Sequence, residues 1–277
     1  MVLDRGSHGA AEVAASVGAD AKIAAVEATK VYETKTGPVH ALERFSLGIR
    51  EAEFVCVLGP SGCGKTTLLW AMSGLHELTS GRVVLDGQPV IGPRPDQIGL
   101  VFQEANLLPW RTLIQNIEFP FEIKKQAPDR DRIAGLLEET GLVGFEKSFP
   151  RELSGGMQQR ASIVRALAQD PSVLLMDEPF GALDAFTRDE MNLLLLKLWS
   201  EARKTALFVT HNVAEAIFLA DRVVVMTPRP GRHARTFEIE LPRPRTIEMT
   251  FEPGFIELIQ EVKATVERGS LRSLEIE

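Results

Sequence analysis

The sequence predicts an α/β fold in which a parallel sheet carries an inserted helical subdomain and follows an N-terminal antiparallel β region. Two short apolar runs, Phe54–Leu58 and residues 172–176, are typical of strands buried on both faces. A glycine-rich turn follows the first run and two acids follow the second, which is where ligands bind to such sheets. From Asn116 to about Gln169 the apolar residues follow a helical period interrupted by prolines. A helical block between strands indicates the inserted subdomain.

The turn after the first run matches the P-loop pattern G-x-x-x-x-G-K-[ST], in its required place between a strand and a helix. Glycines let successive backbone N–H groups turn toward an anion, and the start of the helix adds partial positive charge. Lys65 can reach the β- and γ-phosphates of a nucleotide, and the Thr66 hydroxyl can bind Mg²⁺. The residues predicted to surround the phosphates are Gly59, Pro60, Ser61, Gly62, Cys63, Gly64, Lys65, Thr66 and Thr67.

Composition excludes several classes of protein. The chain has 277 residues, of which 44% are hydrophobic, and a net charge of −7, whereas nucleic-acid-binding proteins usually present a basic surface. No apolar run approaches the roughly 18 residues that span a bilayer, and no secretion signal is visible. The only cysteines, Cys56 and Cys63, offer no disulfide framework, so a reducing cytosol is expected. Cys63 is either a reagent-accessible thiol or simply a small loop residue.

Three parts are expected along the chain. Residues 1–21 are rich in Ala, Gly and Ser and predict a flexible leader, whose acidic residues argue against an organelle transit peptide. Residues 22–240 contain the motifs and predict one nucleotide-binding domain, with the helical subdomain at about 104–169. Residues 241–277 predict a short tail with a helix from Phe255 to Arg268.

The strands of the antiparallel region are expected on either side of the P-loop. Alternation from Ile23 predicts a first strand, and a second is expected over residues 40–50 after a turn at 36–38. The segments SGRVVLDGQPV and GLVFQ (residues 99–103) predict further strands. Tyr32, the only tyrosine, is by itself better explained as a half-buried strand residue than as a platform for a base.

Asp177 and Glu178 end the second apolar run. Side chains of successive strand residues diverge, so the two acids can do different work. Asp177 can hold Mg²⁺ directly or through water, and Glu178 can orient or deprotonate an attacking water. A helix near residues 185–204 and a strand over Thr205–Thr210 follow, so His211 is expected at the same sheet edge, within reach of a γ-phosphate. DRVVVMT and FEIEL predict two later strands.

Together these motifs resemble the ATP-binding subunit of ABC transporters over roughly residues 22–240. The decisive run is LSGGMQQR, residues 153–160, which is similar to the signature motif of that family. The resemblance implies a RecA-like P-loop NTPase core that binds ATP and Mg²⁺. It also implies that the start of the signature helix binds the γ-phosphate of ATP held on a second copy of the chain. The signature residues predicted to contact ATP are Ser154, Gly155, Gly156 and Gln158.

The resemblance assigns further single residues. Tyr32 is expected to stack on adenine, Asp184 to belong to the D-loop, and His211 to be the switch histidine. Gln103 is expected to end its strand and to contact both Mg²⁺ and the attacking water. The residues predicted to act in hydrolysis are Glu178, His211, Lys65 and Gln103, and those predicted to bind Mg²⁺ are Thr66, Gln103 and Asp177.

Partners are implied by the same resemblance. Two copies of the chain are expected to sandwich two ATP molecules head to tail. Separate transmembrane permease subunits are expected to dock near Leu107 to Phe121, where Trp110 is either a docking residue or a core-packing residue. A periplasmic or surface substrate-binding protein would belong to the same system, and the chain would lie on the cytoplasmic side of the inner membrane, held by the permease. No nucleic-acid partner is expected.

Finer features favour one group of importers. The segments PSGCGKTTLL, LLPWRT, TPRPGR and ELPRPR, and the methionine in SGGMQQR, resemble importers of the nitrate, sulfonate and taurine group. The predicted function is therefore to power import of a small oxyanion or organosulfonate. The alternatives are an export or lipoprotein-release ATPase subunit and a soluble, non-transport ABC ATPase. The soluble proteins need a coiled-coil insert or a second nucleotide domain, which this sequence lacks, and the signature argues against a P-loop kinase or small GTPase.

Overall fold

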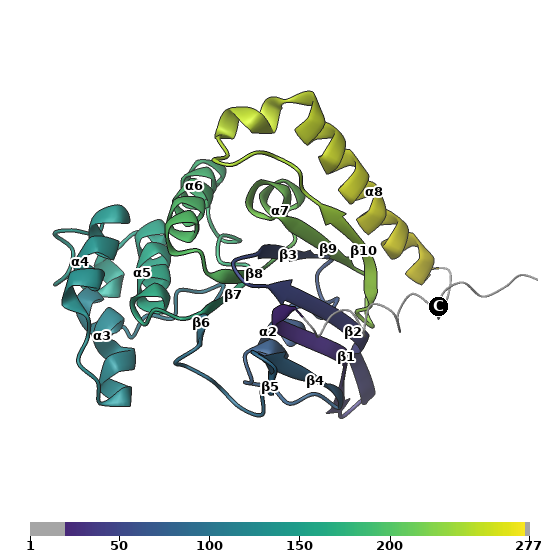
Figure 1. Ribbon diagram of the computed structural model, residues 1–277, viewed down its shortest axis with the longest axis horizontal. Helices are drawn as coiled ribbons and strands as arrows, with labels where there is room; N and C mark the ends of the chain where they lie inside the picture. The colour runs from purple at the N-terminus through teal and green to yellow at the C-terminus, as the bar shows by residue number, and fades with distance from the viewer. Residues whose placement is uncertain (1–19, 275–277) are drawn as a thin grey trace, which may run out of the picture. The chain divides into compact units, whose positions relative to one another are not determined.

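The structure is a computed structural model that describes residues 20–274, with side chains described as far as residue 268. It divides into two compact units (Figure 1): the first contains the described residues 20–94 and 205–274, and the second contains residues 95–204. In sequence, the second unit is therefore inserted within the first. Apart from Asp20 and Ala21, the predicted leader lies outside the described residues.

An antiparallel sheet forms the N-terminal part of the first unit, in the strand order β2-β1-β4-β5. Its strands are β1 (Ala21–Thr34), β2 (Gly37–Arg50), β4 (Ser80–Leu85) and β5 (Gln88–Pro89). A tight turn joins β1 to β2, and Gly37 leaves it with a φ of +117°, a conformation that favours glycine. This sheet confirms the predicted N-terminal antiparallel β region.

The P-loop strand β3 (Phe54–Leu58) has all five of its residues buried. It pairs in parallel with β8 (Thr205–Thr210) on one side and with β9 (Arg222–Met226) on the other, and β10 (His233–Glu238) pairs antiparallel with β9. Burial on both faces explains why β3 and β8 are apolar without alternation. The helices of the first unit are α2 (Lys65–Met72), α7 (Val213–Leu219) and α8 (Pro253–Leu274), and the 3₁₀ turn η2 (Ile247–Phe251) precedes α8.

Two arginines of the tail cap the carboxyl end of α7. The Arg243 guanidinium donates to the Leu219 carbonyl at 2.8 Å and pairs with Asp221 at 2.8 Å. Arg245 is 5% exposed, and burial lowers its pKa to about 10, so the side chain remains charged at neutral pH. Its Nη1 donates, at 2.8–2.9 Å, to the carbonyls of Ile217, Phe218 and Ala220. The guanidinium thus satisfies helix-end carbonyls that have no partner within the helix.

The second unit contains one parallel strand pair and most of the helices. Strand β6 (Ile98–Val101) pairs in parallel with β7 (Val173–Asp177). The helices are α3 (Leu113–Lys124), α4 (Arg130–Glu139), α5 (Gly155–Ala168) and α6 (Ala185–Ala202), and the 3₁₀ turn η1 (Pro150–Glu152) precedes α5. Figure 1 shows α3, α4 and α5 grouped together, and their buried apolar side chains share one core that includes Leu113, Ile117, Ile133, Leu137 and Val164.

Side-chain caps begin all four helices of this unit. Thr112 forms a capping box with Gln115 at the start of α3, and Asp129 caps α4. Ser154 caps α5 and Asp184 caps α6. Each such cap stabilises a helix by about 1 kcal/mol. Two of the predicted site residues are therefore held in place by local hydrogen bonds.

Two boundaries differ from those expected. The strand expected over residues 99–103 ends at Val101, so Gln103 lies in the following loop and does not end the strand. The Phe102 carbonyl accepts a hydrogen bond from the Gln159 amide at 3.1 Å, so a side chain of α5 holds the chain where the strand was expected to continue. The helical pattern from Asn116 onward is divided among three helices, and Pro120 is accommodated within the first of them.

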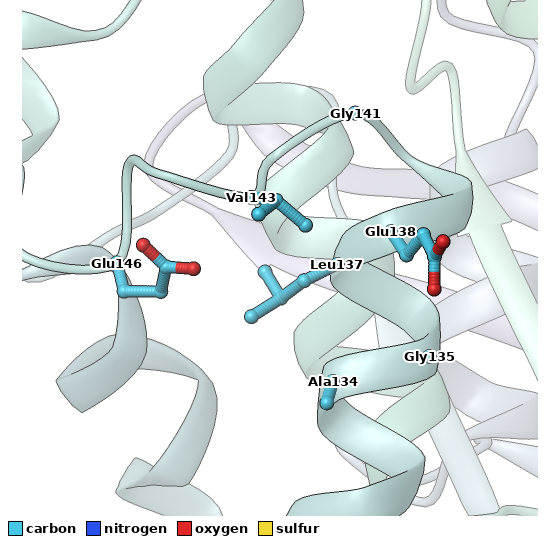
Figure 2. Close-up of a pocket in the computed structure, with 7 residues that line it drawn as sticks. All are labelled: Ala134, Gly135, Leu137, Glu138, Gly141, Val143 and Glu146. Atoms are coloured by element: carbon cyan, nitrogen blue, oxygen red, sulfur yellow. The ribbon is translucent and has the colours of Figure 1, made fainter.

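An open hollow of about 640 Å³ lies against α4 in the second unit (Figure 2). Figure 2 shows the Leu137 and Val143 side chains close together, with the Glu146 carboxylate on the other side of the hollow. The remaining lining residues are Ala134, Gly135, Glu138 and Gly141. None of the predicted site residues lines this hollow.

Replacing Arg245 tests the contribution of the tail to stability. We expect Arg245→Met to lower the free energy of unfolding by about 3 kcal/mol, because buried carbonyls lose their donor and each such loss costs about 1–3 kcal/mol. Urea unfolding followed by circular dichroism measures the change. Arg268→Met is the control: its guanidinium bonds the Ala264 carbonyl on the exposed side of α8, so its effect should stay within about 0.5 kcal/mol. Equal effects of the two changes would contradict a capping role for Arg245.

Candidate nucleotide-binding site

The P-loop adopts the conformation that its glycines were expected to allow. Strand β3 ends at Leu58 and α2 begins at Lys65, immediately after Gly64, whose φ is +104°. Gly62 also has a left-handed φ, of +76°. A Cβ added at Gly64 would lie 2.5 Å from the Ala41 carbonyl oxygen, so only glycine fits at this position. The loop thus leads directly into a helix N-terminus, where backbone N–H groups lack helical partners and can bind an anion.

Lys65 provides the positive charge of this loop. Its side chain is 4% exposed, and its ammonium donates to the Gly59 carbonyl at 2.9 Å and to the Pro60 carbonyl at 3.2 Å. The first turn of α2 contains no acidic residue that would oppose an anion. The ammonium therefore lies over the loop itself, while Thr66 follows within the first helical turn. This arrangement concentrates positive potential where a phosphate would bind.

Cys63 is not the accessible thiol that one of the two interpretations allowed. Its side chain is 1% exposed, and its Sγ lies only 2.7 Å from where a Cβ on Gly59 would be. The thiol therefore packs against the start of the loop, and a side chain at position 59 would have to displace it. Cys56 is also buried, and burial raises the pKa of its thiol. Neither cysteine exposes its thiol to solvent.

Tyr32 is half-buried, as expected for a strand residue, and belongs to a cluster of rings. Its hydroxyl lies 3.2 Å from His76 Nδ1, and the His76 ring stands edge-on to the Trp70 ring, with 4.7 Å between centroids. The Lys30 ammonium lies 5.0 Å from the centre of the tyrosine ring, a cation–π contact. Because Trp70 belongs to α2, this cluster ties Tyr32 to the P-loop helix. Sequence reasoning missed the cluster, since no motif relates these positions.

His211 lies at the same sheet edge as the P-loop. In the parallel pairing of β3 with β8, Leu58 is opposite Thr210. Gly59 and His211 are the next residues of their respective strands, so both leave the sheet at neighbouring positions. His211 is exposed, and Asn212 immediately after it caps α7. A helix cap thus fixes the backbone beside an accessible imidazole.

The predicted acids of the second unit occupy the end of β7. Asp177 is the last residue of the strand and is buried, whereas Glu178 is half-buried with a φ of +43°. A left-handed conformation in a non-glycine residue is uncommon, and such strain often occurs at functional sites. The Gln103 Nε2 atom lies 3.6 Å from where a Cβ on Gly181 would be, and the Gly181 N–H donates to the Glu178 carbonyl at 3.0 Å. The structure therefore brings Gln103 near the turn that Glu178 begins.

The first turns of α5 and α6 lie close to one another. Ser154 is exposed and accepts a hydrogen bond from the Met157 N–H at 3.3 Å, which fixes the start of α5. A Cβ added at Gly156 would lie 3.0 Å from the Thr187 methyl group, so this turn of α5 approaches the first turn of α6. Asp184 accepts from both the hydroxyl and the N–H of Thr187, and these hydrogen bonds lower the pKa of its carboxyl group.

Gln158 has a structural task in addition to its predicted contact with ATP. Its amide donates to the Pro150 carbonyl at 3.0 Å and to the Leu153 carbonyl at 3.1 Å. These bonds hold the chain that leads into α5. Gln158 therefore supports the position of Ser154, whatever it contacts in a complex.

The loop predicted to receive the permease is organised around one buried amide. Asn116 is fully buried; its Oδ1 accepts from the Leu108 N–H at 2.6 Å, and its Nδ2 donates to the Arg111 carbonyl at 3.1 Å. Trp110 lies within this loop and is 71% exposed. The core-packing alternative for Trp110 is therefore wrong, and its docking role stays a prediction.

The side chains predicted to bind Mg²⁺ suit that ion by their chemistry. Among residues 20–268, no group of three or more His, Cys, Asp or Glu side chains is arranged to hold a metal ion. The predicted ligands Thr66, Gln103 and Asp177 offer only oxygen atoms, and Asp177 is a buried carboxylate at a strand end. Mg²⁺ prefers such oxygen ligands, few in number, together with waters and substrate phosphates.

Comparison with known proteins identifies the family. A model of the ABC transporter family matches residues 42–181. The aliphatic sulfonates import ATP-binding protein SsuB of Bacillus cereus is 42% identical over 88% of this chain and 96% of its own length. The taurine import ATP-binding protein TauB of Rhizobium johnstonii is 46% identical over 82% of this chain and 88% of its own. The nitrate import ATP-binding protein NrtD of Synechocystis is 43% identical over 85% and 91%, respectively.

A solved structure has the same fold. The ATP-binding cassette MJ0796, in a dimeric post-hydrolysis state bound to ADP and Pi, matches with a TM-score of 0.70 and 34% identity, over 79% of this chain and all of that one. The chain belongs to the ABC transporter family and is an ATPase of that family. The predicted P-loop NTPase fold and the predicted family are both confirmed.

Replacing Tyr32 tests its predicted role in nucleotide binding. We expect Tyr32→Ala to weaken the binding of ATP and of ADP equally, since stacking acts on the base that both share. In nucleic-acid complexes such stacking is worth about 1–3 kcal/mol per base. Titration with a fluorescent ADP analogue gives the dissociation constants. Phe251→Ala is the control, because Phe251 is an exposed aromatic residue of the same unit. Unchanged affinity in Tyr32→Ala would make this tyrosine an ordinary strand residue.

Proposed function

We propose that this chain hydrolyses ATP to power import of a small oxyanion or organosulfonate through a separate permease. The observation that carries the proposal is the start of α5. Ser154 and Gly155 are exposed there, and the first turn of the helix contains no acidic residue. A helix N-terminus of this kind suits an anion supplied from outside the chain, as the γ-phosphate on a second copy would be.

In this proposal some of the predicted residues bind the nucleotide and others act in its hydrolysis. The P-loop N–H groups and Lys65 hold the β- and γ-phosphates, and Tyr32 stacks on adenine. Thr66, Gln103 and Asp177 would hold Mg²⁺, and the ion would neutralise charge on the phosphates. Glu178 accepts a proton from the attacking water or orients it. Gln103 contacts that water, and the exposed His211 contacts the γ-phosphate.

Two copies of the chain form each complete site in this proposal. Ser154, with the adjacent glycines and Gln158, binds the γ-phosphate held by the P-loop of the partner copy. Asp184 lies beside this turn, at the start of α6. A head-to-tail dimer generates two equivalent sites, and the dimeric state of the MJ0796 cassette supports this arrangement. Hydrolysis removes the phosphate that joins the two halves, so the dimer opens.

Separate permease subunits are proposed to dock between Leu107 and Phe121. The exposed Trp110 supports this assignment, because large aromatic side chains commonly anchor protein interfaces. Among the residues that the structure describes, no helix combines the length and apolarity that crossing a bilayer requires. We propose that the chain lies at the cytoplasmic side of the inner membrane, held by the permease, with a periplasmic or surface substrate-binding protein in the same system.

The relatives support the choice of transported compound. Their names include import of aliphatic sulfonates, taurine and nitrate, which are small anions or carry a sulfonate group. These names favour import over the alternatives of export, lipoprotein release or a soluble non-transport role. We propose no contact of this chain with the transported compound, because an ATPase subunit acts on the permease.

Replacing Glu178 separates binding from hydrolysis. We expect Glu178→Gln to bind ATP normally and to lose about a hundredfold or more in turnover, because an amide cannot act as a general base. The variant should also form a dimer with ATP that is stable enough for gel filtration. Glu257→Gln, an exposed change in α8, should leave turnover unchanged. Turnover by Glu178→Gln close to that of wild type would rule out the role of Glu178.

A mixing experiment tests the shared site. Chains carrying Lys65→Ala and chains carrying Ser154→Arg should each be nearly inactive, the first for lack of phosphate binding and the second because a bulky side chain blocks closure. In a mixed head-to-tail dimer both lesions fall in one site, and the other site is intact. An equal mixture should recover about a quarter of wild-type hydrolysis, since half of the dimers are mixed and each has one intact site.

The matched control mixes Lys65→Ala with wild type. After the activity of the wild-type dimers, about a quarter of the mixture, is subtracted, it gives the activity of dimers that contain one damaged P-loop. If each P-loop were completed by the signature of its own chain, both sites of the first mixture would stay damaged. No recovery at any ratio, with mixed dimers demonstrated by two affinity tags, would reject the shared site.

A further inference from the structure

The loop TPRPGR, residues 227–232, joins β9 to β10 and is closed by its own hydrogen bonds. The Thr227 N–H donates to the Arg232 carbonyl at 2.9 Å. The Thr227 hydroxyl accepts from the Arg232 N–H at 2.9 Å and donates to the Pro230 carbonyl at 3.0 Å. Two prolines restrict the same residues further. These features describe a stiff loop, here called the backing loop.

The backing loop is bound to strand β2 beside the P-loop. The Gly231 N–H donates to the Ala41 carbonyl at 3.0 Å, and the Glu43 N–H donates to the Gly231 carbonyl at 3.1 Å. An ion pair between Arg232 and Glu43, at 2.6 Å, lies next to these bonds. Two backbone hydrogen bonds in opposite directions fix the position of Gly231 relative to β2.

Gly231 in turn lies against the backbone of the P-loop. A Cβ added to it would be 2.2 Å from the Cys63 carbonyl oxygen and 2.6 Å from the Met226 methyl carbon. Both distances are far inside van der Waals contact, so any side chain here must displace the P-loop or the strand. The φ of Gly231 is not in the left-handed region. Contact with Cys63, and not backbone conformation, therefore requires glycine.

The contact acts on a peptide group of the P-loop, whose backbone N–H groups are proposed to bind phosphate. The Cys63 carbonyl and the Gly64 N–H are part of one planar trans peptide, in which C=O and N–H point in opposite directions. A surface that fixes the carbonyl on one side therefore fixes the direction of the N–H on the other. The carbonyl faces the backing loop, so the Gly64 N–H points away from it.

We propose that the backing loop sets the orientation of the Cys63–Gly64 peptide for phosphate binding, with Gly231 as the positioning residue. The inference rests on the proposed nucleotide site and names a part of it that lies outside the P-loop sequence. It also gives a task to TPRPGR, which sequence analysis related to one group of importers without assigning it a role.

The test replaces Gly231 and compares it with a glycine that has free space. Gly231→Ala should displace the P-loop, whereas Gly92→Ala should not, because nothing lies within 4 Å of a Cβ added at Gly92 in the same unit. Dissociation constants for ADP are measured by calorimetry, well below the melting temperature of each variant. We expect Gly231→Ala to bind ADP about tenfold more weakly, the effect of losing one charge-assisted hydrogen bond.

Kinetics distinguishes positioning from general damage. Gly231→Ala should raise KM for ATP much more than it lowers kcat, since Glu178 and the signature are untouched. If Gly231→Ala fails to fold, Thr227→Val replaces it: that change keeps the shape of the side chain and removes the hydroxyl that closes the backing loop. Thr227→Val should weaken ADP binding in the same direction, with kcat preserved.

Unchanged ADP affinity in a folded Gly231→Ala, or in Thr227→Val where the first variant does not fold, would overturn the inference. A failure of the proposed function gives a different result from a failure of the inference. If the wild-type chain binds no ADP, the nucleotide site and the inference fall together. If wild type and Gly92→Ala bind ADP and the backing-loop variants bind it equally well, only the inference fails.

Discussion

The complete burial of β3 is the constraint on which the rest of the first unit depends. Because β3 has parallel neighbours on both sides and no exposed residue, the chain can leave the core only where the strand begins and ends. At its amino end, the Phe54 N–H is held by the Asp221 carboxylate, which also pairs with Arg243 of the tail. At its carboxyl end the chain must turn at once into α2, and this turn is the P-loop. The register of β3 therefore determines where the N–H groups of the P-loop lie.

Sequence alone predicted the elements that local patterns encode. The predicted bounds of β3 and β8 matched the structure. A continuous apolar run that is limited by glycine or polar residues leaves few choices for where a strand begins and ends. The family followed from motifs whose spacing is local. Gln103 was put in the wrong element because the bond that ends its strand comes from Gln159, more than fifty residues away. No local pattern reports such a bond.

The same limit applies to the long-range contacts that sequence reasoning missed. These contacts join segments that are distant in the sequence. They are those of His76 and Trp70 near Tyr32, of Arg245 at the end of α7, and of Gly231 against Cys63. Their residue types carry no motif, and a histidine, arginine or glycine has many uses. In the segments TPRPGR and ELPRPR, composition marked a family without indicating a task. Only the folded chain shows which carbonyl each residue meets.

The left-handed backbone at Glu178 favours one type of residue, and the role that we propose for this position favours another. Folding alone favours glycine there, because a side chain in this region of conformational space costs about 1–2 kcal/mol. The role in hydrolysis that we propose for Glu178 requires a carboxylate at this position, and glycine cannot provide one. Selection for stability and selection for hydrolysis thus favour different residues, and the surrounding turn must hold the less stable choice. With the role that we propose for Glu178, thermal stability screens of this protein would enrich inactive chains at position 178.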